Sequence, residues 1–230
     1  MANLVKQMLN RSTEIILPKK RKSPSKYTLV EEYVNLSSDK LVLLCQQQDL
    51  AAFNVLISRY EKAVLNLAMR YLRDYHLALE ESQEIFIKLF TKIKDFRREA
   101  SFSTWWYRIA VNHCLNVITK KKRHSSGGKK TVSLESVLEN KQHSDLKDNR
   151  QISPEQILAK RESSDIIWQA IQALPQDQTQ VIILYHYEKL KYEEIAEIMG
   201  VPVTTVCACL YRARKKLKRK LLLGGRPSHG

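Results

Sequence analysis

The chain has few cysteines and no long apolar segment. It contains 4 cysteines in 230 residues, at positions too scattered for the disulfide framework of a small secreted domain. No apolar run approaches the roughly 20 residues that a membrane-spanning helix needs. The first residues also lack the apolar stretch and the small-residue cleavage site of a signal peptide. We therefore expect a soluble, cytoplasmic protein without membrane insertion.

Ligands for a structural metal ion are scarce as well. No compact group of cysteines and histidines has the spacing of a zinc finger. Cys207 and Cys209 are close in sequence, but on a helix their side chains would point about 200° apart. We expect them to flank a core stripe as small side chains, and the alternative is a regulatory thiol. No metal ion and no cofactor is expected.

Acidic residues are outnumbered by basic ones. The chain has 39 Lys and Arg against 24 Asp and Glu, for a formal net charge of +15. Such a balance indicates a polyanionic partner. Hydrophobic residues make up 43% of the chain, which is enough for two small domains with their own cores.

Strand patterns are absent, and helical periodicity recurs on both sides of a polar stretch. The expected fold is all-α, with two helical domains joined by a flexible linker. The expected segments are a flexible basic leader (1–36), a helical domain (37–124), a linker (125–153), a second helical domain (154–221) and a tail (222–230).

Each domain has its own expected helices. Those of the first domain are at 38–48, 50–71, 77–93 and 104–121. Ser38 and Asp49 are expected to cap the first two of them, and a polar loop at 95–101 precedes the last. The second domain is expected to begin with helices at 154–174 and 176–187.

Residues 192–217 have the pattern of a helix-turn-helix. Three glutamates begin an amphipathic helix, and Gly200 follows where a helix end favours a left-handed residue. Pro202 stops this helix, and Thr204 or Thr205 is expected to cap the next one. Two helices on a short turn, the second one basic, are typical of a motif that binds the DNA major groove. The alternative is an ordinary helical hairpin with a solvated basic end.

On a helical wheel, the second helix of this motif has two distinct faces. The stripe that should face the core consists of Val206, Leu210, Ala213 and Leu217. The opposite face consists of Ala208, Tyr211, Arg212 and Lys215. The Tyr211 hydroxyl and the cations of Arg212 and Lys215 can bind phosphates, and Arg212 can also reach a base edge. This face is therefore predicted to contact nucleic acid.

Aromatic residues gather at one place in the first domain. They are Phe102, Trp105, Trp106 and Tyr107, with Arg108 beside them, and the same expected helix ends in the basic run 120–123. Rings that stack on bases, next to cations that hold the backbone, are typical of proteins that bind single strands. The alternative is that these rings are core residues. Since neighbours on a helix point about 100° apart, at least one of the two tryptophans should be buried.

The third expected helix has an acidic beginning. Glu80, Glu81, Gln83 and Glu84 precede the apolar residues Ile85, Phe86, Leu89 and Phe90. In so basic a protein, an acidic and amphipathic surface suggests a protein partner. The alternative, which composition alone favours, is a solvated acidic face.

Together these motifs resemble the bacterial RNA polymerase sigma factors of the extracytoplasmic-function (ECF) group, group 4 of the sigma-70 family. The first domain resembles region 2 of that family in DLAAFNVLISRY, EESQEIF and FSTWWYRIAVNHCLN. The second resembles region 4 in LPQDQTQVIIL and in YEEIAEIMGVPVTTV followed by LYRARKKL. The resemblance covers most of residues 39–123 and 155–219. An ordered succession of motifs is more specific than a lone helix-turn-helix.

The resemblance implies three sets of binding residues. Core polymerase would be bound by Glu81, Gln83, Glu84 and Phe86. The −35 promoter element would be bound by Thr204, Thr205, Ala208, Tyr211, Arg212 and Lys215. The −10 element would be bound by Arg97, Arg98, Ser101, Phe102, Trp105, Trp106, Arg108, Asn112, Asn116, Lys120, Lys121 and Arg123, and the loop at 96–101 would hold a flipped base.

The resemblance also implies a function and partners. The protein would be a promoter-specificity subunit, not an enzyme, that recognises both elements and promotes DNA opening for transcription initiation. Its partners would be core RNA polymerase (the β′ clamp helices and the β flap), promoter DNA and an anti-sigma factor. It would be nucleoid-associated when in the holoenzyme. The alternatives are a stand-alone helix-turn-helix transcriptional regulator and an enzyme that acts on nucleic acid.

Several positions depart from the family pattern. The family usually has Asp at the position of Asn116 and often Arg at that of Thr119. Where it usually reads Val-Lys-Ser-Arg, this chain has cysteine at 207 and 209. The loss of two cations removes expected phosphate contacts, each of which strengthens DNA binding. We therefore expect −35 binding that is weaker, differently specific or sensitive to thiol oxidation.

Overall fold

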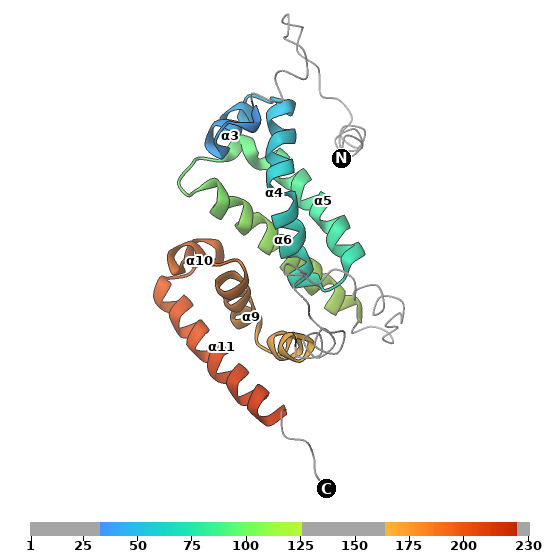
Figure 1. Cartoon of the computed structure of the whole chain (residues 1–230), viewed down its shortest axis with the longest axis vertical. Helices are drawn as coiled ribbons and strands as arrows, with labels where there is room; N and C mark the ends of the chain where they lie inside the picture. The colour runs from blue at the N-terminus through green and yellow to red at the C-terminus, as the bar shows by residue number, and fades with distance from the viewer. Residues whose placement is uncertain (1–32, 126–163, 225–230) are drawn as a thin grey trace, which may run out of the picture. The chain divides into compact units, whose positions relative to one another are not determined.

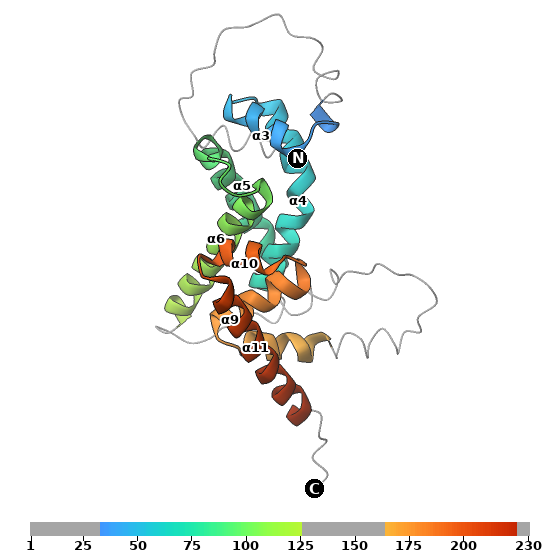
Figure 2. The same ribbon diagram turned by 90° about the vertical axis from the view of Figure 1, so that its left-hand side faces the viewer.

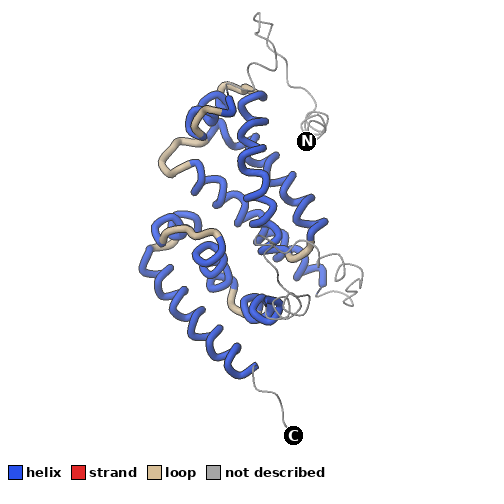
Figure 3. The backbone as a smooth tube through the Cα atoms, in the orientation of Figure 1, coloured by secondary structure: helices blue, strands red, loops and turns tan. Residues whose placement is uncertain are grey.

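The computed structural model describes residues 33–125 and 164–224, and every regular element in these ranges is a helix (Figure 3). The chain divides into two compact units, Met1–Gln142 and His143–Gly230. The prediction of an all-α fold with two helical domains is therefore confirmed. The linker, nearly all of the leader, most of the tail and the expected helix start at residue 154 lie outside the described residues.

The first unit is built around one long helix. Its elements are α3 (Ser38–Gln46), α4 (Leu50–Leu72), α5 (Tyr75–Lys92), the short 3-10 helix η1 (Ile93–Asp95) and α6 (Phe102–Ser125). α4 packs against α3, α5 and α6 (Figures 1 and 2). The largest fully buried side chains of this unit include Leu41, Val42, Val64, Leu67, Ile85, Ile93 and Trp106. Burial of each such side chain contributes roughly 1.5–3 kcal/mol before the entropy cost of folding.

Single polar side chains fix where the first helices begin. Asp49 accepts hydrogen bonds from two N–H groups at the start of α4, at 2.9 and 3.1 Å, and this predicted cap is confirmed. The cap predicted at Ser38 is wrong by one residue. Ser37 caps α3, and Ser38 Oγ instead accepts a hydrogen bond from Arg59 Nη1 at 2.9 Å.

Two further caps start the later helices earlier than predicted. Asp74 accepts a hydrogen bond from the N–H of Leu77 (3.0 Å), so α5 begins at Tyr75. Ser101 Oγ accepts a hydrogen bond from the N–H three residues on (3.1 Å), so α6 begins at Phe102. The predicted starts at 77 and 104 are each two residues late, because the caps at Asp74 and Ser101 fix the first turns at Tyr75 and Phe102.

The second unit contains a helix at 164–172, α9 (Gln176–Ile182), the π-helix η2 (Ile183–Tyr187), α10 (Tyr192–Met199) and α11 (Val203–Gly224). The helix predicted at 176–187 is present, but its second half has wider turns. Glu188 N–H donates to Ile183 C=O (3.1 Å), which is the i to i+5 spacing of a π-helix. α11 packs against α9 and α10. The core includes Ile171, Leu184, Ile195, Ile198, Val206 and Leu210.

The turn between α10 and α11 has the predicted glycine. Gly200 has φ 67°, and Val201 N–H donates to Ala196 C=O (3.1 Å), which closes the end of α10. The predicted cap at Thr204 or Thr205 is wrong, since α11 begins at Val203 and both threonines lie in its first turn. Pro202 precedes the helix instead, and its carbonyl accepts the first helical hydrogen bonds.

Among the described residues, no single helix is long and apolar enough to cross a membrane. α10 and α11 pass this test only as a pair, by length and composition, and the pair is bent by 100°. The apolar residues Ile195, Val206 and Leu210 of this pair lie in the core of the second unit.

Candidate nucleic-acid interface

α11 has the two faces that the helical wheel predicts. Val206, Leu210 and Ala213 are buried in the second unit, while Leu217 is half-buried. Ala208, Arg212 and Lys215 are exposed on the other face. The ring of Tyr211 is also there, with 68% of its surface exposed. An exposed aromatic ring between cations is a surface that can contact phosphates and base edges.

The start of α11 adds two hydroxyls to this face. Thr204 is exposed and Thr205 is half-buried. Arg212 Nε donates to Ala208 C=O (3.2 Å), so the guanidinium lies along its own helix. The predicted residues of this helix are therefore brought together on one exposed surface.

The two cysteines of α11 lie on opposite sides of the helix, as predicted. Cys207 is exposed and Cys209 is buried. The thiol of Cys209 donates to Asp177 Oδ2 on α9 (3.3 Å), and burial together with this carboxylate raises the pKa of Cys209. The two sulfurs therefore cannot share a metal ion or form one disulfide while α11 is intact. No group of three or more His, Cys, Asp and Glu within the described ranges could hold a metal ion.

An aromatic and cationic cluster beside α11 is not evident from the sequence. Tyr185 packs on Tyr192 (ring centroids 5.2 Å apart), and the Arg214 guanidinium lies over the Tyr185 ring at 5.2 Å. Arg214 is also 3.5 Å from His186. Burial and the nearby positive charge of Arg214 lower the pKa of His186. Only the tertiary fold brings η2, α10 and α11 together here, so no local pattern could have indicated this cluster.

In the first unit, most of the aromatic residues are core residues. Trp106 is 1% exposed and stacks on Tyr107 with ring centroids 3.9 Å apart. Phe102 is also buried, and its ring lies 5.7 Å from that of Trp105. The expectation that one of the two tryptophans is buried is therefore confirmed. Trp106 and Phe102 do not offer their rings to a partner, and of the two tryptophans only the half-buried Trp105 does.

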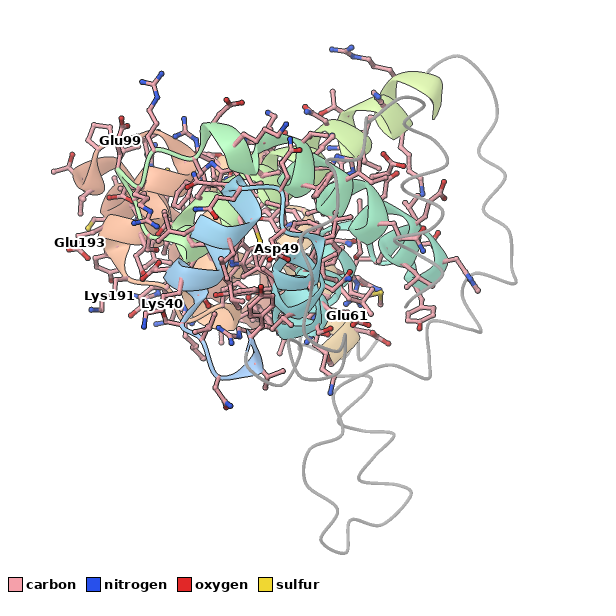
Figure 4. All side chains as sticks on the ribbon, turned by 90° about the horizontal axis from the view of Figure 1, so that it is seen from above. Lys40, Asp49, Glu61, Glu99, Lys191 and Glu193 are labelled. Atoms are coloured by element: carbon pink, nitrogen blue, oxygen red, sulfur yellow. The ribbon has the colours of Figure 1, made fainter. Side chains whose placement is uncertain are left out.

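The loop at 96–101 and the outer side of α6 carry the other predicted residues. The exposed ones are Arg97, Arg98, Ser101, Arg108, Asn112, Asn116, Lys120, Lys121 and Arg123. Figure 4 shows Glu99, on the same loop, at the outer edge of the first unit. Lys121 Nζ lies 4.0 Å from Asp74 Oδ2, at a solvated position where an ion pair contributes little to stability. This surface therefore combines amides with an excess of positive charge.

The acidic side of α5 is engaged with α6. Glu81 contacts His113 Nε2, and Lys88 Nζ contacts the other ring nitrogen, Nδ1. Since an ammonium only donates, Nδ1 accepts from Lys88 and Nε2–H donates to Glu81. Glu81 is 17% exposed and Phe86 is buried, so neither presents an open side chain. Gln83 and Glu84 are half-buried, and Glu80 is exposed.

Comparison with known proteins assigns both units. Residues 56–124 match the family model of Sigma-70 region 2, and residues 164–217 match that of Sigma-70, region 4. The chain is 36% identical over 188 residues to the ECF RNA polymerase sigma-E factor of Haemophilus influenzae, covering 81% of this chain and 96% of that protein. The chain belongs to the ECF sigma factors.

Further relatives agree with this assignment. The RNA polymerase sigma-H factor of Pseudomonas aeruginosa is 34% identical to this sigma factor over 182 residues, covering 79% of this chain and 92% of that protein. Among solved structures, CnrH in complex with the cytosolic domain of CnrY has a TM-score of 0.57 at 18% identity. The match covers 81% of this chain and 97% of that chain. The sigma factor RpoE of Bartonella quintana, in complex with the anti-sigma factor NepR, has a TM-score of 0.55 at 19% identity, covering 76% and 98%. These structures share the fold.

Two departures from the family pattern have a local structural reading. Thr119, where the family often has Arg, donates from Oγ1 to the carbonyl of Leu115 (2.8 Å), so its hydroxyl is used within α6 of the sigma factor. Cys207 stands on the exposed side of α11, where the family usually has a cation.

Proposed function

We propose that this sigma factor directs core RNA polymerase to its promoters by holding the −10 element with the first unit and the −35 element with the second. One observation carries the proposal. Each unit has its own core and presents one long helix, α6 or α11, whose exposed side is rich in cations and polar groups. Two weak contacts on one chain combine into a strong one because the second is made at high effective concentration.

The −35 contact is assigned to α11. Thr204, Thr205, Ala208, Tyr211, Arg212 and Lys215 are the residues proposed to touch DNA. A helix that exposes a small residue near its beginning, as α11 does at Ala208, can lie close to the floor of the major groove. Arg212 and Lys215 then supply the phosphate and base-edge contacts. Cys207 leaves this helix with one cation fewer than the family usually has on this face.

The −10 contact is assigned to the 96–101 loop and to the exposed side of α6. Trp105 is the aromatic group proposed to stack on DNA, and the asparagines at 112 and 116 can read base edges. Phe102 and Trp106 support this surface from within the core. The cations at 97, 98, 108, 120, 121 and 123 would hold the backbone.

The polymerase contact is assigned to the acidic side of α5. Gln83 and Glu84 remain the proposed contacts, with the exposed Glu80 and Leu79 beside them. Glu81, through its contact with His113, and the buried Phe86 are proposed to hold α5 in place. The proposed receiving surfaces are the β′ clamp helices for the first unit and the β flap for the second. An anti-sigma factor is a further proposed partner, since a sigma factor of similar fold is bound to one.

The protein is proposed to act without chemistry of its own, since its relatives are sigma factors and the polymerase supplies the reaction. Because its partners are polymerase and chromosomal DNA, the proposed place of action is the cytoplasm. The proposed division of the chain is 1–36, 37–124, 125–153, 154–221 and 222–230, with promoter contacts in the second and fourth segments.

Run-off transcription tests the proposal. Core polymerase is supplied with a library of genomic promoters, with and without the protein. Start sites that depend on the protein are expected, each with common sequence elements upstream at the −10 and −35 positions. DNA binding without affinity for core polymerase and without new start sites would indicate a stand-alone regulator instead.

A further inference from the structure

The 96–101 loop, which joins η1 to α6, is attached to α3. We propose that Gln46, on the last turn of α3, is a positioning residue that holds this loop in the shape required to take up an unpaired base. The inference rests on the proposed function, from which it takes the base-binding role of the loop. It adds a residue of α3, which precedes the segment that matches Sigma-70 region 2.

One side-chain amide of α3 binds both sides of the junction where the loop begins. Gln46 Nε2 donates to the carbonyl of Ile93 at 3.1 Å and to that of Phe96 at 2.8 Å. Phe96 N–H itself donates to the Ile93 carbonyl at 3.2 Å, which closes η1. The two amide hydrogens of Gln46 are thus used on the backbone, one at the first residue of η1 and one at the first residue of the loop.

Gln46 is itself fixed on its own side. α3 buries Leu41, Val42 and Cys45 in the core of the first unit. The helix ends at once, because Gln48 is left-handed (φ 66°) and Asp49 already caps α4. Since the backbone that carries Gln46 is held by two packed helices, its hydrogen bonds can restrain the loop instead of following it.

The restrained loop contacts the residues of α6 that are proposed to bind DNA. The ring of Phe96 packs on Trp105, with centroids 5.0 Å apart, and Trp105 is the half-exposed aromatic residue of α6. Arg98 is left-handed (φ 60°), and its Nη2 donates to the Asp39 carbonyl in the first turn of α3 at 3.4 Å. A left-handed residue other than glycine persists only where its surroundings hold it. α3 therefore contacts the loop at two points, one at each end of the helix.

The test measures base discrimination by the holoenzyme, assembled from core polymerase and the full chain. The probe is a single-stranded oligonucleotide with the −10 sequence mapped by run-off transcription, and a second one differs from it by one base. Gln46→Met keeps the length of the side chain and removes the donor, while Gln46→Lys keeps a donor. Gln47→Met and Gln47→Lys, at the exposed neighbouring position, are the matched controls.

For Gln46→Met, the ratio of the two affinities is expected to fall roughly tenfold, since two hydrogen bonds of ordinary strength are lost. Gln46→Lys should recover most of the ratio, and both controls should leave it unchanged. The affinity for core polymerase should stay the same in all four variants. A residue with only a structural role would instead lower the unfolding midpoint and both affinities together.

The inference is overturned if Gln46→Met discriminates as well as Gln47→Met, or if Gln46→Lys is as poor as Gln46→Met. Should Gln46→Met fail to fold, Gln46→Asn takes its place, because it keeps the amide but is too short to reach both carbonyls. If the unchanged holoenzyme does not discriminate between the oligonucleotides, the base-binding role of the loop fails, and the inference with it. If the unchanged holoenzyme discriminates between the oligonucleotides and the Gln46→Met holoenzyme discriminates as well, only the role of Gln46 fails.

Discussion

α6 and α11 are both long, basic helices, but they use their aromatic residues in opposite ways. In α11, Tyr211 is 68% exposed and the core is made by aliphatic side chains such as Val206 and Leu210. In α6, Trp106 and Phe102 are in the core, and Trp105 is only half-exposed. We infer that α11 would offer an exposed ring of its own to DNA, whereas the buried rings of α6 support the surface formed by its exposed side and the 96–101 loop. Five predictions test this difference, from the largest expected effect to the smallest.

Removal of a large ring should be costly in α6 and nearly free in α11. Trp106→Ala is expected to lower the free energy of unfolding of the first unit by about 3–5 kcal/mol, because it leaves a cavity in a packed core. Tyr211→Ala should change stability by no more than about 0.5 kcal/mol. Chemical denaturation followed by circular dichroism measures both. Equal costs for the two substitutions would contradict the comparison.

The polar contact between α5 and α6 should matter for the first unit alone. His113→Leu removes the partner that Glu81 and Lys88 share, so partly buried charged groups lose hydrogen bonds. We expect a loss of about 2 kcal/mol in unfolding free energy. Lys92→Leu, at an exposed position of α5, is the control and should have almost no effect. A His113→Leu protein as stable as the control would show that this network is not a support of α6.

A cation on the surface of α11 should act on DNA binding and not on stability. Arg212→Ala is expected to weaken binding to a −35 duplex about tenfold and to reduce the slope of log affinity against log salt by about 1. Fluorescence anisotropy at several salt concentrations measures both quantities. Lys94→Ala removes the same charge from η1 in the first unit and serves as the control for net charge. If the two variants bind alike, Arg212 makes no local contact.

The four cysteines should differ in reactivity. Cys207 is exposed. Burial raises the pKa of Cys45 and of Cys114 to about 12. Burial and the Asp177 carboxylate together raise the pKa of Cys209. Since the thiolate is the reactive form, a raised pKa means less of it at neutral pH. Brief alkylation of the folded protein, read by mass spectrometry, should therefore label Cys207 alone.

The effect of thiol oxidation on DNA binding follows from the same contrast. If oxidation acts at all, it should act through Cys207, so Cys207→Ser should abolish it and Cys209→Ser should not. Affinity for the −35 duplex, measured with and without oxidant, decides between them. Unchanged affinity under oxidant in the unsubstituted protein would end the hypothesis of a regulatory thiol.

The course of the helices could largely be predicted from the sequence, because apolar period and capping are local. Asp49 and Gly200 act within one turn of their own position, and both were predictable. Starts were misplaced where the capping residue was assigned to a loop, as at Ser101 in the expected polar loop at 95–101. The faces of α11 also followed from the wheel, since one side of that helix packs against α9 and α10 and the other does not.

The candidate site was predicted less completely, because contact between distant segments has no local signal. The period of α6 does not say whether Phe102 or Trp105 is covered, since the loop at 96–101 and Tyr60 of α4 decide it. Glu81 lies in the same acidic stretch as Glu80 and Glu84, yet its carboxylate contacts His113 of α6. From the sequence, core and surface both remained open for these rings, and Glu81 was predicted as a surface contact. The tertiary structure decides both points.

The sequence by itself determined the all-helical character, the division into two units, the family and the exposed side of α11. Helical character and the faces of α11 depend on spacing and single-turn hydrogen bonds, which are local, and the two units and the family depend on the order of such local patterns along the chain. Only the tertiary structure decided which aromatic rings of α6 are core, that Arg214 covers Tyr185, and that Gln46 holds the backbone at Phe96. The physical reason is that contacts between residues 29 to 50 positions apart depend on how whole helices pack against one another.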